Sequence, residues 1–246
     1  GIIMKKINLL TILFLMIFVS CSEEGDLKPK PQSNSINKIL NLGASRVEGG
    51  KPEYESYRYE LWKKLKENNL IFDFVGTQTD ESTYPQFNNM IFDCDHEGRG
   101  GWTSADILDE LYNWLSQTGP PDFVLFSSPA GNDALEGLSY TQAVSNINDI
   151  IDVIQEFNPN TTIIIEQMAP ARSNIMTSEL TGFLEQMKKD ILTIAESKTT
   201  SNSEVIAIDM YSGFNDSLLA DDVHYNENGA RFIAERYFGV LVSVLE

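Results

Sequence analysis

The stretch Ile39-Leu40-Asn41-Leu42-Gly43-Ala44-Ser45 is a short apolar run that ends at a glycine and is followed by a serine. Short continuous apolar runs are typical of strands that are buried on both faces of a parallel sheet. A serine directly after such a strand lies beyond its carboxyl end, which is where open α/β sheets place their functional groups. This stretch therefore predicts both the class of fold and the position of a site.

Four further apolar runs follow along the chain, and segments with helical periodicity separate them. The runs are 71–75, 123–126, 163–165 and 205–208, and the helical patterns cover 56–68, 104–116, 143–157, 178–197 and 227–245. Strands that alternate with helices form a parallel sheet covered on both faces. We expect an α/β fold, a three-layer α/β/α sandwich with a five-stranded parallel sheet, in one domain over residues 37–246.

Two polar segments are expected at the same edge of the sheet as Ser45. Gly131-Asn132-Asp133 follows the third strand, and Asp221-Asp222-Val223-His224 precedes the last helix. A serine hydroxyl is a poor nucleophile until a base takes its proton, and imidazole is the usual base near neutral pH. The ordered set therefore predicts a hydrolase in which His224 activates Ser45 and Asp221 orients the imidazole ring.

The residues alone leave alternatives at each position. His96 is the only other histidine, and a structural hydrogen-bonding role is the favoured interpretation for it. Asp222 competes with Asp221 as the orienting acid, although the three-residue spacing favours Asp221. Ser45 and Asn132, each taken alone, also fit an ordinary loop serine and a turn cap.

Four motifs carry a resemblance to a known superfamily, the SGNH (GDSL-type) hydrolases. Gly43-Ala44-Ser45 resembles the first motif, with Ala44 where an Asp is usual, and Gly98-Arg99-Gly100-Gly101-Trp102 resembles the second. Ala130-Gly131-Asn132-Asp133 resembles the third, with Ala130 in place of a glycine, and Asp221-x-x-His224 matches the fifth. The segment 95–102, together with Tyr57-Arg58, is similar to the carbohydrate esterases that include acetylxylan esterases.

This resemblance implies a flavodoxin-like SGNH hydrolase fold and a catalytic triad of Ser45, His224 and Asp221, with no cofactor. It also implies an oxyanion hole made by the backbone N–H groups of Ser45 and Gly101 and by the side-chain amide of Asn132, with Gly100 as the alternative to Gly101. Ala44 is the departure that puts the rigidity of the nucleophile turn in question.

The predicted function is a serine esterase that removes acetyl or similarly short acyl groups from polysaccharide. One alternative is a lipase-type or thioesterase-type SGNH enzyme that acts on other short-chain esters. The other is a catalytically silent, glycan-binding surface lipoprotein, for which Ala44 and Ala130 are the arguments. A set of aromatic residues is a candidate sugar platform, although each is individually more typical of packing: Tyr54, Tyr57, Tyr84, Phe87 and Trp102.

The charge of the chain limits its partners. The formal net charge is -18, which disfavours nucleic acid and anionic membranes as partners and is compatible with neutral, acylated sugars. Asp93, Asp95 and Glu97 invite a calcium site, but their spacing is not that of an EF-hand and a solvated acidic loop is the favoured interpretation. We expect no metal and a monomer.

The first 36 residues predict export and a tether. Lys5-Lys6, an apolar run over 7–19 and then Ser20-Cys21 are typical of a lipoprotein signal peptide spanning residues 1–20. Residues 21–36 are expected to be a flexible tether from a lipidated Cys21, placing the protein on the periplasmic or extracellular side of a bacterial outer membrane. A plain secretory signal is the alternative. With Cys94 then unpaired, no disulfide framework is expected.

Overall fold

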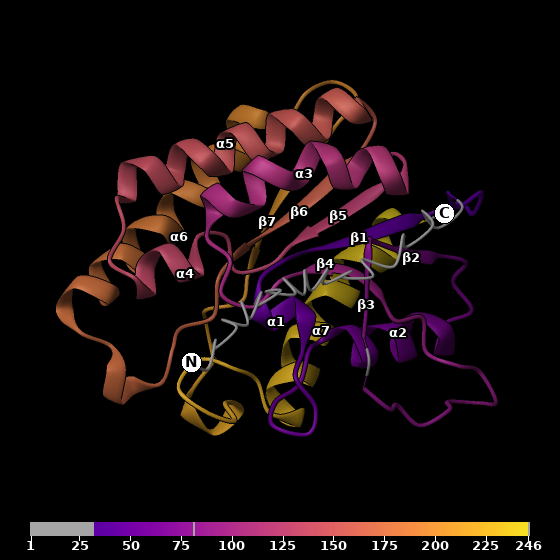
Figure 1. Cartoon of the computed structure of the whole chain (residues 1–246), viewed down its shortest axis with the longest axis horizontal. Helices are drawn as coiled ribbons and strands as arrows, with labels where there is room; N and C mark the ends of the chain where they lie inside the picture. The colour runs from indigo at the N-terminus through magenta and orange to yellow at the C-terminus, as the bar shows by residue number, and fades with distance from the viewer. Residues whose placement is uncertain (1–31, 81, 246) are drawn as a thin grey trace, which may run out of the picture.

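A computed structural model describes residues 32–80 and 82–245, so the expected signal peptide and Cys21 lie outside the described residues. The chain forms a central sheet with helices packed on both faces (Figure 1). The strands are β1 (Lys38–Gly43), β2 (Asp73–Val75), β3 (Gln78–Thr79), β4 (Asp95–Gly98), β5 (Phe123–Phe126), β6 (Thr162–Gln167) and β7 (Val205–Asp209). The α/β/α sandwich expected from the sequence is confirmed.

The sheet is mostly parallel and is built around β1. Its order is β3-β4-β1-β5-β6-β7, and β2 also pairs with β1. β1, β5, β6 and β7 run parallel to one another, so Ser45 after β1 and the loops after β5 and β6 meet at one edge. This edge is where open parallel sheets place functional groups.

The sheet has 7 strands, so the expectation of five was wrong. β2 pairs with the first half of β1, at Lys38↔Asp73, while β4 pairs with its second half, at Gly43↔Gly98. β3 is a two-residue strand antiparallel to β4. β4 was not predicted from the sequence because its residues are Asp-His-Glu-Gly, a composition that is typical of a loop and not of a buried strand.

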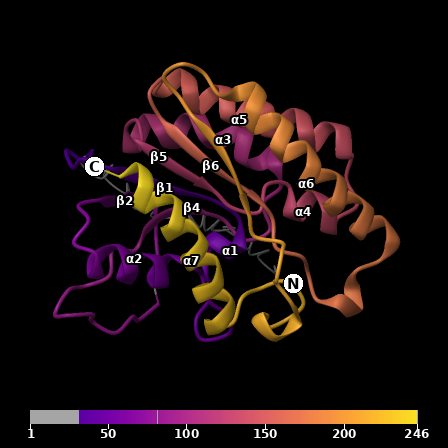
Figure 2. The same ribbon diagram turned by 180° about the vertical axis from the view of Figure 1, so that it is seen from behind.

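Two layers of helices cover the two faces of the sheet. The helices and 3-10 turns are α1 (Ser45–Glu48), α2 (Arg58–Glu67), α3 (Ser104–Thr118), α4 (Gly131–Leu135), α5 (Tyr140–Phe157), η1 (Ser173–Ile175), α6 (Ser178–Lys198), η2 (Asp216–Leu218) and α7 (Glu227–Val244). α3, α5 and α6 pack on one face, whereas α2 and α7 cover the other (Figure 2).

β1, β2, β5, β6 and β7 each contribute to both hydrophobic cores, because successive side chains of a strand point to opposite faces. Leu40, Leu42 and Val124 belong to the core under α3, α5 and α6. Ile39 and Leu125 belong to the core under α2 and α7. Burial on both faces is the physical reason why these runs are continuously apolar.

Among the described residues, no helix is both long and apolar enough to cross a membrane. Cys94 is the free cysteine of this part of the chain, and it is partly buried next to β4. The tether predicted over residues 21–36 is described only from residue 32 onwards.

Candidate active site

Ser45 is the first residue of α1, immediately beyond the carboxyl end of β1. The turn that leads to it requires glycine at position 43. A Cβ on Gly43 would lie 2.8 Å from Ser127 O and 2.8 Å from a methyl group of Val47, so no larger residue fits without a shift of the backbone. The close approach of β1, β5 and α1 thus fixes the position of the serine.

Three side chains predicted from the sequence lie in one hydrogen-bonded line. His224 Nε2 is 2.8 Å from Ser45 Oγ, and His224 Nδ1 is 2.7 Å from Asp221 Oδ2. The other oxygen of Asp221 accepts hydrogen bonds from the backbone N–H groups of Val223 and His224, at 2.9 and 2.7 Å. The loop between η2 and α7 therefore holds the acid and the imidazole as one unit.

The electrostatics of Asp221 fix the tautomer of His224. Burial raises the pKa of Asp221, but hydrogen bonds from the His224 ring and from the backbone of His224 and Val223 outweigh this effect and leave the pKa below its ordinary value. An ionised Asp221 accepts a hydrogen bond from Nδ1–H, which leaves the lone pair of Nε2 directed at the Ser45 hydroxyl. This arrangement is suited to removing the proton of the serine.

Asp222 and His96, the alternatives to Asp221 and His224, do not take part in this hydrogen-bonded line. The Asp222 carboxylate is directed at Arg172, with Nε at 3.7 Å from Oδ1. His96 lies within β4 with 2% of its surface exposed, and its Nδ1 accepts a hydrogen bond from Gly98 N–H at 3.0 Å. His96 thus has the structural role that the sequence favoured for it.

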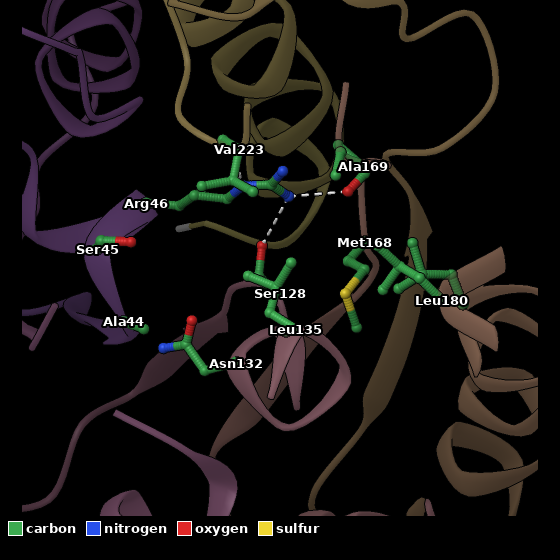
Figure 3. A pocket seen from close by; sticks show the side chains of 13 residues that line it. Ala44, Ser45, Arg46, Ser128, Asn132, Leu135, Met168, Ala169, Leu180 and Val223 are labelled. Atoms are coloured by element: carbon green, nitrogen blue, oxygen red, sulfur yellow. Dashed lines mark hydrogen bonds between the residues drawn. The ribbon is translucent and has the colours of Figure 1, made fainter. Parts of the chain in front are cut away.

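The predicted oxyanion donors come from two loops beside Ser45. Asn132 lies in the first turn of α4 and donates one amide hydrogen to Trp102 O at 2.7 Å, which turns the side chain toward the serine (Figure 3). The neighbouring Asp133 is buried and accepts hydrogen bonds from Ser104 N and Oγ at 2.8 and 2.6 Å, so α4 is anchored to α3.

The geometry distinguishes between Gly100 and Gly101 as candidate oxyanion donors. The N–H of Gly100 donates to Glu48 Oε2 at 2.7 Å and is therefore occupied. Gly101 has a φ of +79°, in the left-handed region that favours glycine, and its N–H meets no acceptor among the described residues. Of the two, Gly101 is the one whose N–H remains available to a bound oxyanion.

The acidic segment before these glycines is not the solvated loop that the sequence favoured. Glu97 has no exposed surface, accepts hydrogen bonds from Thr77 N and Oγ1 at 2.8 Å each, and forms an ion pair with Arg99. Asp93 accepts a hydrogen bond from Phe74 N–H at 2.8 Å instead of turning toward Glu97. In the described part of the chain, no three His, Cys, Asp or Glu side chains converge as metal ligands would.

Arg46 is a functional residue that the sequence analysis missed. Its guanidinium donates to Val223 O at 2.8 Å, Ala169 O at 2.8 Å, Pro170 O at 3.2 Å and Ser128 Oγ at 3.2 Å (Figure 3). It therefore ties the turn that holds Ser45 to the loops after β5 and β6 and to the loop that bears His224. These contacts hold the turn in place although position 44 carries no Asp.

The carboxyl end of α1 is held by a second arginine. Arg58 is fully buried and donates to Val47 O at 2.6 Å and Glu48 O at 2.8 Å, the carbonyls that a helix end leaves without partners. Asp80 balances its charge at 3.0 Å. A buried arginine has no distinctive signal in the sequence, although the Tyr57-Arg58 pair contributed to the resemblance.

One aromatic residue proposed for a sugar platform contacts the site directly. The Tyr54 ring stacks on the His224 ring, with centroids 3.9 Å apart and an interplanar angle of 16°. A bridge between Glu55 and Tyr225 joins the two loops beside this stack. Tyr57, by contrast, is completely buried in the core and cannot contact a sugar.

The chain matches no protein-family model and no curated protein. Solved structures resemble it over most of its length. A serine-to-alanine mutant of an acetyl esterase, solved with an acetate ion, has a TM-score of 0.73 at 25% identity and covers 84% of this chain and 97% of its own. A family 3 carbohydrate esterase from Talaromyces cellulolyticus has a TM-score of 0.72 at 25% identity, covering 84% and 97%.

A third structure extends the likeness to a bacterial protein. The family 3 carbohydrate esterase of Clostridium thermocellum has a TM-score of 0.67 at 26% identity and covers 84% of this chain and 96% of its own. The protein is a carboxylic ester hydrolase by its fold and by these likenesses, and the order of its motifs along the chain resembles that of the SGNH (GDSL-type) hydrolases.

Proposed function

We propose that this protein is a serine esterase that removes acetyl or similarly short acyl groups from carbohydrate through a triad of Ser45, His224 and Asp221. The observation that carries this proposal is the hydrogen-bonded line from Ser45 Oγ to His224 Nε2, at 2.8 Å, and from His224 Nδ1 to Asp221 Oδ2, at 2.7 Å. These are the distances at which a base can take the proton of a nucleophile.

The reaction begins with attack by Ser45 Oγ on the carbonyl carbon of the ester. His224 Nε2 takes the hydroxyl proton as the new C–O bond forms, and Asp221 stabilises the resulting imidazolium. His224 then returns this proton to the oxygen of the departing alcohol as the original ester bond breaks. Water, deprotonated by the same imidazole, attacks the acyl carbon, and His224 returns the proton to Ser45 Oγ as the acyl–Ser45 bond breaks and the carboxylic acid is released.

The negative charge of the tetrahedral intermediate requires fixed donors. We assign these to the N–H of Ser45, the N–H of Gly101 and the amide of Asn132. The support is that the Gly101 N–H has no acceptor within the described residues and that the Asn132 amide is held in place by Trp102 O. Donors fixed in advance stabilise the transition state without reorganisation.

The proposal that the substrate is an acetylated carbohydrate rests on the similar structures, which are described as an acetyl esterase and as family 3 carbohydrate esterases. The net charge of -18 supports a substrate that is neutral, because a polyanionic glycan would be repelled. Among glycans, neutral acetylated polysaccharides therefore fit best.

We also propose that the protein is a surface lipoprotein anchored through Cys21. The support is the sequence alone: a basic pair, an apolar run and Ser20-Cys21. Fractionation of cells that express the wild type or Cys21→Ala tests this. The variant is expected to leave the membrane fraction, and retention of both proteins there would contradict the anchor.

Acetate release from a panel of acetylated xylan, mannan, pectin and peptidoglycan tests the activity and its substrate together. The wild type is expected to release acetate from a neutral acetylated glycan, and Ser45→Ala is expected to release none. Equal release by the two proteins would eliminate the esterase and leave a glycan-binding role. Release from peptidoglycan alone would eliminate the proposed class of substrate.

A further inference from the structure

An apolar groove begins at Ser45 and runs outward between α4 and α6. Its inner section has Ser45 and Asn132 at one end and Met168 and Leu180 along its walls (Figure 3), and Leu184 also lines it. An outer section continues toward Phe183. Leu135 and Leu180 line both sections, so the two form one continuous groove.

The walls of the groove offer an acyl chain contact but almost no free hydrogen-bonding group. Met168 and Leu184 are each 5% exposed and are therefore fixed by packing. Arg46 is the one charged residue of the inner section, and its guanidinium is already bonded to Val223 O, Ala169 O, Pro170 O and Ser128 Oγ. A sugar hydroxyl placed here would lose its hydrogen bonds to water without replacement, which is costly.

The direction of the groove assigns it to the acyl half of the ester. The departing oxygen must lie within reach of His224 Nε2, so the alcohol leaves on the side of His224 and Tyr54. Neither of these residues forms part of the walls. With the carbonyl oxygen directed at Asn132 and the alcohol at His224, the groove is left for the substituent on the carbonyl carbon.

The dimensions of the groove limit the length of the acyl chain that it can hold. Leu180 and Leu184 lie one turn apart on α6, about 5.4 Å along its axis, so the apolar wall extends well beyond an acetyl methyl group. Glu136 and Glu179 line the outer section. A long fatty chain would therefore meet carboxylates that need water, whereas a chain of intermediate length would end before them.

We propose that this groove binds the acyl chain of the substrate and that, among the acetyl and other short acyl groups of the proposed function, the enzyme hydrolyses butyryl and hexanoyl esters faster than the acetyl esters that it also accepts. This inference rests on the proposed function, because it takes Ser45 as the acylated residue. Each methylene buried on apolar walls is expected to raise kcat/KM by about fourfold. Leu180 and Leu135, which line both sections of the groove, are then the residues that determine chain length.

A series of p-nitrophenyl esters tests the proposal on the full enzyme, from acetate through butyrate and hexanoate to decanoate. The wild type is expected to show a kcat/KM for hexanoate at least tenfold above that for acetate, with a decline by decanoate. Leu180→Trp fills the groove and is expected to lower the ratio of the kcat/KM for hexanoate to the kcat/KM for acetate to about one.

Two further variants keep the test independent of folding. Leu135→Trp fills the groove from the opposite wall at a side chain that is already 44% exposed, and it is expected to act like Leu180→Trp. Leu192→Trp is the matched control, because Leu192 lies on the same helix α6 but is 53% exposed away from the groove. The control is expected to retain the profile of the wild type.

Three results would overturn the inference. The first is Ser45-dependent hydrolysis that falls tenfold or more from acetate to butyrate, which would leave the proposed function intact. The second concerns the alcohol half of the ester. If Leu180→Trp lowers activity toward 1-naphthyl acetate relative to p-nitrophenyl acetate but keeps the preference of the wild type among acyl chains, the groove binds the alcohol. The third is hydrolysis that is unaffected by Ser45→Ala, which would remove the proposed function and the inference together.

Discussion

Arg46 Nε donates a hydrogen bond to Val223 O at 2.8 Å, which joins the residue after the nucleophile to the residue before the imidazole. Ser45 and His224 lie 179 positions apart in the sequence, and their contact depends on two loops that meet here. The same guanidinium also fixes Ala169 O and Pro170 O. We therefore propose that Arg46 positions Ser45 and His224 relative to each other.

Replacing Arg46 should lower kcat while KM changes little, because a shift of about 1 Å between nucleophile and base can cost on the order of 100-fold in rate. Arg46→Ala is expected to lose about that factor in kcat. Arg46→Lys keeps the charge but not the planar fork of donors, so it should recover only part of the loss. Steady-state kinetics with p-nitrophenyl acetate, alongside urea unfolding, measures both effects.

A purely structural role for Arg46 would give a different pattern. Both variants would then unfold at lower urea concentration but retain the kcat of the wild type while folded. That result would contradict the positioning role.

The stack of Tyr54 on His224 predicts a difference between two substitutions. Tyr54→Phe keeps the ring and should retain most of the activity, whereas Tyr54→Ala leaves one face of the imidazole uncovered. Aromatic stacking contributes about 0.5–1.5 kcal/mol beyond buried area, so kcat/KM for Tyr54→Ala should fall by up to about tenfold. Equal losses in both variants would assign the role of Tyr54 to its hydroxyl group instead.

Asn132 is expected to act in the transition state alone. Asn132→Ala removes one oxyanion donor and should lower kcat by roughly 100-fold to 1,000-fold, with KM nearly unchanged. Asn132→Asp places a carboxylate beside the developing negative charge and should be at least as damaging. A kcat close to that of the wild type in either variant, measured with p-nitrophenyl acetate, would exclude Asn132 from the oxyanion hole.

The raised pKa of Asp93, which lies outside the site, predicts that its contribution to stability depends on pH. Burial raises its pKa to about 6, and the hydrogen bonds from Phe74 and Asp95 N–H groups lower it only in part. Because the ordinary pKa is about 3.9, the folded state binds more protons than the unfolded state between about pH 4 and pH 6. The contribution of Asp93 is therefore fully present below about pH 4 and is lost as the pH rises through 6.

Asp93→Asn removes this dependence while keeping an oxygen that can accept the hydrogen bond from Phe74 N–H. Its melting temperature should exceed that of the wild type by about 2–4 °C at pH 8, which corresponds to roughly 1 kcal/mol. The difference should shrink as the pH falls from 6 to 4. Thermal melts of the two proteins at each pH measure this difference. A difference in melting temperature that stays constant across this range would show that Asp93 does not titrate in it.

The sequence predicted the parts of the molecule that local patterns encode. Runs such as Phe123–Phe126 are apolar because both faces of the strand are buried, and the structure has that strand at the predicted residues. The proximity of Ser45, Asn132 and His224 could also be expected, because these residues belong to short motifs that can be recognised in the sequence, whereas their catalytic roles stay a prediction. The structure brings these three together from loops that follow β1, β5 and β7.

The rest depends on contacts between distant segments, which no local pattern contains. Glu97 reads as a solvated acid in the sequence, and only its pairing with Arg99 and Thr77 makes a buried strand of this segment. Likewise, Arg46 has its role only because Val223 and Ala169 arrive from loops far along the chain. Sequence periodicity reports burial, but it does not report which partner satisfies a buried charge.

We expect Ser45 to carry the acyl group during the reaction. Treatment with a p-nitrophenyl phosphonate ester, followed by mass spectrometry of the intact protein and its peptides, measures this directly. We expect one adduct per chain, located on the peptide that contains Ser45. Ser45→Ala should form no adduct, and His224→Ala should form one only very slowly. An adduct on another residue, or equal labelling of Ser45→Ala, would show that Ser45 is not the acylated residue.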